Sequence, residues 1–125
     1  MRLLLVCLAG ALGTGARYGL GIAAARTLPA DFPYGTFSIN VAGSFLIGVV
    51  QQVAFTHPGF PEIARAALVI GFLGGFTTYS AFSYETLELV GRGAWPSAAL
   101  YVGITTALCL LACAAGMALG RGMSR

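Results

Sequence analysis

The sequence contains no lysine, and only 9% of its 125 residues are charged. A soluble domain carries roughly 25% charged residues, so this chain has too little charge to cover a surface that faces water. Its four acidic residues and single histidine form no recognisable catalytic or metal-binding constellation. We therefore expect neither a soluble domain nor an enzyme.

All the basic residues are arginines, and they are scattered: Arg2, Arg17, Arg26, Arg65, Arg92, Arg121 and Arg125. A nucleic-acid-binding protein gathers its positive charge into a patch or stripe. The scatter instead indicates charges that flank membrane segments, so a lipid bilayer is the expected environment and nucleic acid is not an expected partner.

Cysteine is also scarce, with three residues, Cys7, Cys109 and Cys113, and no CxxC pair. All three fall in apolar segments and are interpreted as small buried hydrophobic residues.

Long apolar stretches are abundant, since 58% of the chain is hydrophobic. A membrane helix needs about 20 predominantly apolar residues. The charge-free stretches predict four such helices, at about 3–28, 35–56, 62–90 and 95–120. The result is an all-α membrane protein with a single transmembrane domain over residues 1–125. We expect the first segment to be a helix of that domain rather than a cleaved signal peptide.

The predicted orientation is ambiguous. With four spans, one side of the membrane has Arg2, Arg65, Arg121 and Arg125, and the other has Arg17, Arg26 and Arg92. This near balance gives the positive-inside rule no clear preference. Insertion in both orientations, followed by assembly of an antiparallel dimer, is the hypothesis that follows.

Polar residues inside the predicted spans are candidates for function because burying them in lipid is costly. Asn40 and Thr36 share a face of the second helix, while Tyr101, Thr105 and Cys109 form one ridge of the fourth. Two interpretations stay open: these side chains line a polar path, or they are hydrogen-bonding residues of ordinary helix packing.

The third span contains the strongest local signal. Gly74 and Gly75 are followed by Thr77 and Thr78 near its middle, and each glycine weakens a helix by about 1 kcal/mol. We expect a broken helix there, with freed carbonyls that suit a cation or freed amides that suit an anion.

Three motifs together resemble the Fluc (CrcB) family of fluoride channels. They are GTGARY (13–18), GTFSIN (35–40) and GGFTTYSAF (74–82). The resemblance covers nearly the whole chain and implies a passive, fluoride-selective channel that exports fluoride across the cell membrane and lowers its toxicity. It also implies an antiparallel, dual-topology homodimer with two narrow pores.

The resemblance further implies roles for individual residues. Gly74 and Thr77 would hold a structural sodium ion at the dimer centre through their carbonyls. Apart from the resemblance, the charge of Arg17 leaves two interpretations open: it attracts anions at the pore mouth, or it anchors the helix at the membrane surface. The residues expected to line the fluoride pore are Asn40, Tyr79, Phe82, Thr36, Ser80, Tyr101 and Thr105, with Cys109 at the end of the fourth-helix ridge.

The sequence departs from the family pattern at a few positions. Tyr79 stands where phenylalanine is usual, Ala81 where threonine is usual, and Cys109 where a hydroxyl is more common. These changes bear on how ions permeate and leave the resemblance intact.

Two other functions stay open at this point. A small proton-coupled drug or cation exporter has a similar size, but the first span lacks the carboxylate that this chemistry needs, and Glu85 and Glu88 lie near the far end of the third. A non-transporting membrane assembly subunit is the other, although it would need neither the polar residues nor the break.

Overall fold

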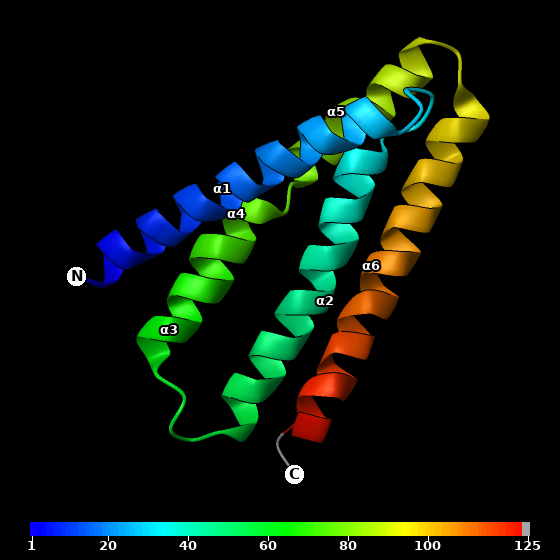
Figure 1. Cartoon of the computed structure of the whole chain (residues 1–125). Helices are drawn as coiled ribbons and strands as arrows, with labels where there is room; N and C mark the ends of the chain where they lie inside the picture. The colour runs from blue at the N-terminus through cyan, green and yellow to red at the C-terminus, as the bar shows by residue number, and fades with distance from the viewer. Residues whose placement is uncertain (124–125) are drawn as a thin grey trace.

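The computed structural model describes residues 1–123, and all the regular elements in that range are helices. Four long helical segments build the molecule (Figure 1), three of them single helices and the third a succession of shorter ones. The elements are α1 (Arg2–Thr27), α2 (Tyr34–Thr56), α3 (Glu62–Ala66), the π-helix η1 (Ala67–Leu73), α4 (Gly74–Phe76), α5 (Tyr79–Gly91) and α6 (Trp95–Met123).

Each of the four segments is long and apolar enough to cross a membrane. The shortest, α2, has 23 residues, and at 1.5 Å per residue it is roughly 35 Å long. The hydrocarbon core of a bilayer is about 30 Å thick. The prediction of an all-α protein with four helices that can span a membrane is therefore confirmed.

Proline and glycine mark the turns between the segments. Pro33 precedes α2 and Pro61 precedes α3, where the missing backbone N–H of proline costs nothing. Gly93, between α5 and α6, has φ of 76°, a left-handed conformation that glycine adopts without steric penalty.

The third segment changes its backbone conformation along its length. Residues 67–73 form a π-helix, and α4 follows directly. Thr77 (φ −81°, ψ 156°) and Thr78 (φ −150°, ψ 110°) are then extended, and a new helix begins at Tyr79. We call these two residues the interruption. Figure 1 shows α1 crossing the third segment near this point, where α4 gives way to α5.

The α2–α6 pair packs along continuous helices through glycine. Gly48 of α2 lies against the Cys113 carbonyl, and Gly116 of α6 lies against the Phe45 carbonyl. A Cβ atom at either glycine would overlap that backbone. Small residues of this kind let membrane helices approach closely and gain dispersion contacts.

The crossing of α1 over the third segment uses glycine too. A Cβ at Gly13 would overlap the Phe72 carbonyl, and one at Gly75 would overlap the Gly10 carbonyl. Gly15, on another face of α1 at the crossing, and Gly19 further along have no neighbouring atom in the way of a Cβ. Close approach on this helix is therefore confined to the part that faces the third segment.

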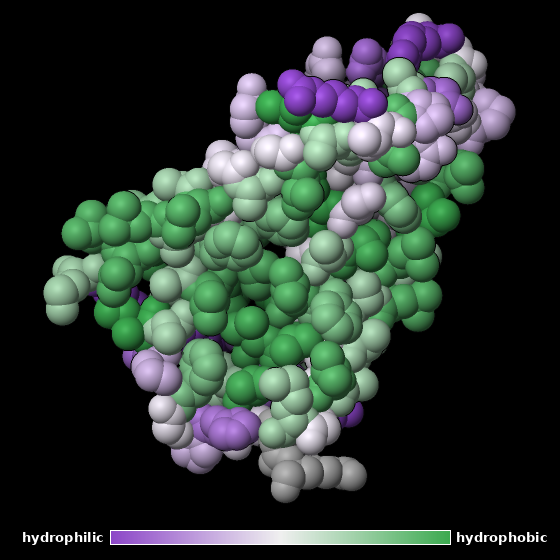
Figure 2. All heavy atoms as spheres, viewed as in Figure 1, coloured by the Kyte–Doolittle hydropathy of each residue, from purple (hydrophilic) through white to green (hydrophobic). Residues whose placement is uncertain are grey.

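The surface is apolar over the middle of the face shown in Figure 2, and hydrophilic residues gather at its two ends. Large apolar side chains such as Leu4, Leu111 and Ile70 are exposed. The buried hydrophobic cluster is small, consisting of Phe82, Leu89, Ala98 and Tyr101. This arrangement suits a chain whose helices are covered by lipid or by another membrane protein.

Candidate functional site

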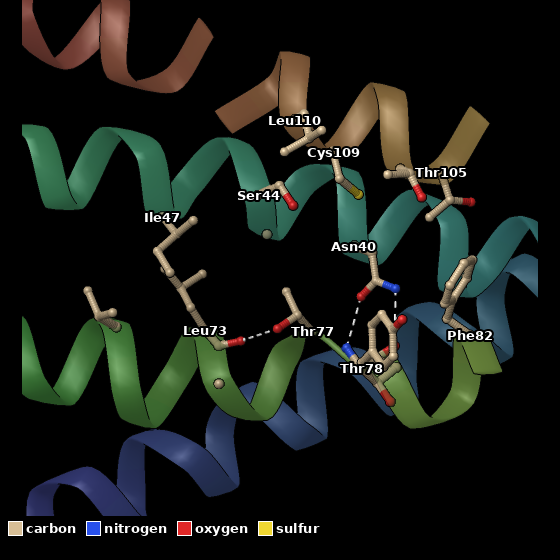
Figure 3. A pocket seen from close by; sticks show the side chains of 15 residues that line it. Asn40, Ser44, Ile47, Leu73, Thr77, Thr78, Phe82, Thr105, Cys109 and Leu110 are labelled. Atoms are coloured by element: carbon tan, nitrogen blue, oxygen red, sulfur yellow. Dashed lines mark hydrogen bonds between the residues drawn. The ribbon is translucent and has the colours of Figure 1, made fainter. Parts of the chain in front are cut away.

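Asn40 of α2 holds the interruption of the third segment. Its side-chain oxygen accepts a hydrogen bond from the Thr78 N–H at 2.8 Å, and its side-chain nitrogen donates to the Thr78 carbonyl at 3.1 Å (Figure 3). The paired bonds imitate those that a neighbouring strand gives an extended residue. Both backbone groups of Thr78 are thereby satisfied at a depth where lipid offers no partner.

Two backbone N–H groups at the interruption do not form the usual helical hydrogen bonds. In a continuous helix the Thr78 N–H would donate to the Gly74 carbonyl and the Ala81 N–H to the Thr77 carbonyl. Instead Thr78 donates to Asn40, and Ala81 donates to the Thr78 hydroxyl at 3.2 Å. The carbonyls of Gly74 and Thr77 have therefore lost their usual helical donors.

Gly75 lies between those two residues, and its carbonyl is bound by α1. The Nε of Arg17 donates to it at 3.0 Å, and the Thr14 hydroxyl donates at 3.5 Å. A bond from a guanidinium is roughly twice as strong as one between neutral groups. The Nε of Arg17 thus ties α1 to the third segment, a contact that the sequence did not indicate.

A cavity of about 420 Å³ lies beside the interruption, and we call it the central cavity (Figure 3). Side chains from α2, α6 and the third segment line it, and apolar residues such as Ile47, Leu73 and Leu110 form much of its wall. It brings together seven residues singled out from the sequence: Asn40, Gly74, Thr77, Tyr79, Phe82, Thr105 and Cys109.

Thr105 provides an unusual group in that wall. Its side chain is buried, and its hydroxyl has no hydrogen-bond partner within residues 1–123. A threonine in a helix commonly bonds a carbonyl of the preceding turn, as Thr86 does here with Phe82. A buried hydroxyl without a partner costs free energy, and a ligand that accepts its proton would remove that cost.

Two aromatic residues lie at the edge of the central cavity, and they differ in exposure. Tyr79 is 80% exposed, whereas Phe82 is only 9% exposed. Their ring centroids are 5.5 Å apart, and Phe82 also packs on Tyr101 at 5.1 Å. Aromatic ring edges carry partial positive charge, so both rings can face an anion.

Glu85 occupies a position that the sequence interpretation missed. Its two carboxylate oxygens accept hydrogen bonds from the Thr36 hydroxyl and the Tyr101 hydroxyl, each at 2.7 Å. The carboxylate therefore joins α2, α5 and α6. The signal in the sequence was helical spacing, since Phe82, Glu85 and Leu89 share one face of α5.

A second cavity, of about 540 Å³, lies on the Glu85 side of the interruption. Arg17, Thr36, Thr78 and Glu85 are among its lining residues. Thr78 lines both cavities, so the residue that Asn40 holds separates them.

The residues predicted to line the pore do not all lie at one cavity. Two of them, Ser80 and Tyr101, line neither cavity. Ser80 is exposed and its hydroxyl lies 3.2 Å from that of Thr78, while Tyr101 is fully buried. Tyr101 contacts the site through its hydrogen bond to Glu85 and its packing on Phe82.

Carboxylates and thiols do not assemble a metal site in the described part of the chain. No group of three His, Cys, Asp or Glu side chains is close enough to hold an ion among residues 1–123. The oxygen atoms in this region belong to backbone carbonyls and to amide and hydroxyl side chains, and hard cations accept such ligands.

Comparison with known proteins gives a consistent family match. Residues 4–117 match the family described as CrcB-like protein, Camphor Resistance (CrcB). A relative named fluoride-specific ion channel FluC, from Anaeromyxobacter sp. (strain K), is 46% identical over 98% of both chains. A relative of the same name from Roseiflexus sp. (strain RS-1) is 43% identical over all of this chain and 98% of its own.

Proposed function

The chain belongs to the CrcB family, and from this premise we propose that it is a fluoride channel of the cell membrane. It crosses the membrane with four helices and lets fluoride leave the cytoplasm passively, which lowers fluoride toxicity. The observation that carries the proposal is the central cavity, where Asn40, Thr105 and the rings of Tyr79 and Phe82 meet without any cationic side chain.

The chemistry of that cavity suits fluoride. The ion is small and strongly hydrated, so a path must replace its water contacts, yet conduction requires that the ion also leaves. The Thr105 hydroxyl, which has no partner within residues 1–123, and the aromatic edges are weak donors. They can replace water around the ion and still release it. Asn40 gives one N–H to Thr78, which leaves the second N–H of its amide to face the ion.

Two copies are needed to enclose the path. In the single chain Tyr79 is 80% exposed at the edge of the cavity, and Gly74 is exposed as well. We propose that a second, oppositely oriented copy covers both. The near balance of arginines between the two ends supports the antiparallel arrangement.

A structural sodium ion at the centre of that dimer is part of the same proposal. The carbonyls of Gly74 and Thr77 fit the role of sodium ligands, because the N–H groups that would bond them in a helix donate to side chains instead. Sodium would supply a fixed positive charge near the midplane. Arg17 and Asn40 would keep the carbonyls in position by fixing the backbone between and beside them.

Neither alternative function is favoured. A proton-coupled exporter needs a carboxylate that can exchange protons and a cation. Glu85 is the one carboxylate among the site residues, and hydroxyl groups already occupy both its oxygens. An assembly subunit has no need of a held interruption beside a cavity.

Fluoride efflux from liposomes tests the proposal. Purified protein is reconstituted in vesicles loaded with potassium fluoride or potassium chloride, a potassium ionophore is added, and each anion is recorded with an electrode. We expect rapid fluoride efflux and retained chloride. A folded sample, with the expected helical circular dichroism, that releases no fluoride would refute the function.

A variant pair tests the site separately. Phe82→Ile removes a buried ring from the cavity and should reduce the fluoride rate at least tenfold, since one weak contact of about 1.4 kcal/mol is a factor of ten. Phe60→Ile, in the loop between α2 and α3, makes the same chemical change away from both cavities and should leave the rate unchanged. Equal rates for the two variants would remove Phe82 from the path.

A further inference from the structure

A separate hollow lies at the end of the molecule where α2 ends, α3 begins and α6 ends, far along each helix from the interruption. Its volume is about 540 Å³. Six residues line it: Gln51, Gln52, Phe55, Arg65, Met117 and Arg121. Two are cationic, two are neutral amides, two are apolar, and none is acidic.

The charge of this hollow is not compensated within the described chain. Nearby Arg2 forms an ion pair with Glu62 at 2.9 Å, so the charges of these two residues cancel. Arg65 and Arg121 have no ion pair or hydrogen bond from their guanidinium groups within residues 1–123. Among the described residues that line this hollow, Arg65 and Arg121 are positively charged and none is acidic. Glu62, which lines a neighbouring hollow together with Arg65, is paired with Arg2.

The position of the hollow along the helices corresponds to the membrane surface. Arg121 lies in the last turn of α6 and Arg65 near the start of the third segment, whereas Met117 is one turn deeper. Phe55 is 86% exposed. The cationic groups are thus at headgroup level, and apolar side chains lie beside them where acyl chains begin.

We propose that this hollow binds the headgroup of an anionic phospholipid. Arginine forks bind phosphate oxygens with two parallel hydrogen bonds, and the glutamine amides can bind the remaining polar groups of the headgroup. Basic hollows between membrane helices are suited to such lipids. The proposal is independent of fluoride conduction, because none of the six residues lines either cavity of the pore region.

Counting bound lipids by native mass spectrometry tests the proposal on the full-length protein in a neutral detergent. The probes are dioctanoyl phosphatidylglycerol, dioctanoyl phosphatidylcholine and inorganic phosphate. We expect saturable binding of phosphatidylglycerol, and little binding of phosphatidylcholine or of millimolar inorganic phosphate. Equal binding of the two lipids would overturn the proposal, and so would phosphate binding as tightly as phosphatidylglycerol, which would indicate a site for the free ion.

Charge-matched variants locate the site. Arg65→Gln with Arg121→Gln should weaken phosphatidylglycerol binding about twenty-five-fold, at about fivefold per arginine. Arg26→Gln with Arg92→Gln removes the same charge from the opposite end and should change binding less than twofold. If the double variant does not fold, the single variants Arg65→Gln and Arg121→Gln replace it, and each should weaken phosphatidylglycerol binding about fivefold. Equal losses at both ends would reduce the effect to net charge and contradict the proposal.

Discussion

The two main helix crossings of this molecule solve the same packing problem in different ways. The α2–α6 pair joins two continuous helices through glycine against backbone, and near one end both helices also donate a hydrogen bond to Glu85. The crossing of α1 over the third segment also uses glycine, but there the third segment is interrupted and side chains must satisfy its backbone. Glycine-mediated close packing is therefore common to both contacts, while hydrogen bonds from Asn40 and Arg17 hold the interrupted part that bears the site.

The largest effect should come from filling the α2–α6 crossing. Gly116→Ala places a Cβ into the Phe45 carbonyl, and a continuous helix pair can relieve the overlap only by moving apart. We expect a loss of about 3 kcal/mol or failure to fold, as for severe overpacking. Thermal unfolding in detergent measures it.

Gly103→Ala, on the same helix, is the matched control because within residues 1–123 no atom of another helix lies within 4 Å of the added Cβ. It should be neutral or slightly stabilising, since alanine favours a helix by about 1 kcal/mol over glycine. An equal loss in both variants would mean that helix propensity, and not close approach, sets the effect.

Next in size is the loss of the Asn40 amide. Asn40→Ala leaves the N–H and carbonyl of Thr78 without partners, which should cost about 2 kcal/mol for two hydrogen bonds within a membrane protein. Fluoride efflux should fall with it. Ser44→Ala, one turn further along α2 in the same cavity wall, should retain stability. A stable Asn40→Ala protein would show that the interruption does not depend on this residue.

A smaller effect is expected when Arg17 is replaced. Arg17→Gln removes the 3.0 Å bond to the Gly75 carbonyl, but the Thr14 hydroxyl remains near it. We expect a loss of about 1 kcal/mol in unfolding free energy. Arg26→Gln removes the same charge from an exposed position of α1 and should change stability little. If the two variants unfold alike, the inward bond of Arg17 is not stabilising.

The smallest effect belongs to a contact outside both crossings. Arg2→Gln breaks the ion pair with Glu62, whose two side chains are 56% and 77% exposed. Exposed pairs contribute at most about 1 kcal/mol and are screened by salt, so the midpoint of thermal unfolding should hardly move. A large shift would mean that this end of α1 is held more firmly than the exposure of the pair indicates.

The sequence predicted the frame well because the frame depends on local properties. Absence of charge over about 20 residues is enough to identify a membrane helix, and prolines such as Pro33 and Pro61 mark its ends. The glycines and threonines at 74–78 led to the expectation of a broken helix, because helix propensity is also a local property. The π-helix at 67–73 had no such signal.

The partners within the site were not predictable in the same way. Asn40 is 38 residues from Thr78, and Arg17 is 58 residues from Gly75. Neither pair follows from helical periodicity, because the crossing geometry brings them together. Glu85 was left out of the predicted site because it lies far from the middle of the span. It shares a helical face with Phe82, and this face brings its carboxylate to Thr36 and Tyr101.

The central claim is that one chain is half of a pore completed by an inverted second copy, and cysteine labelling tests it most directly. In a background with Cys7, Cys109 and Cys113 changed to serine, Gly59→Cys and Asp31→Cys report on opposite ends of the bundle in separate proteins. Intact spheroplasts are treated with a membrane-impermeant maleimide, and the label on each purified dimer is counted. We predict that both positions are labelled in about half of the chains, with one label per dimer, as a dual-topology pair requires. Full labelling of one position with protection of the other would show a single orientation and contradict the claim.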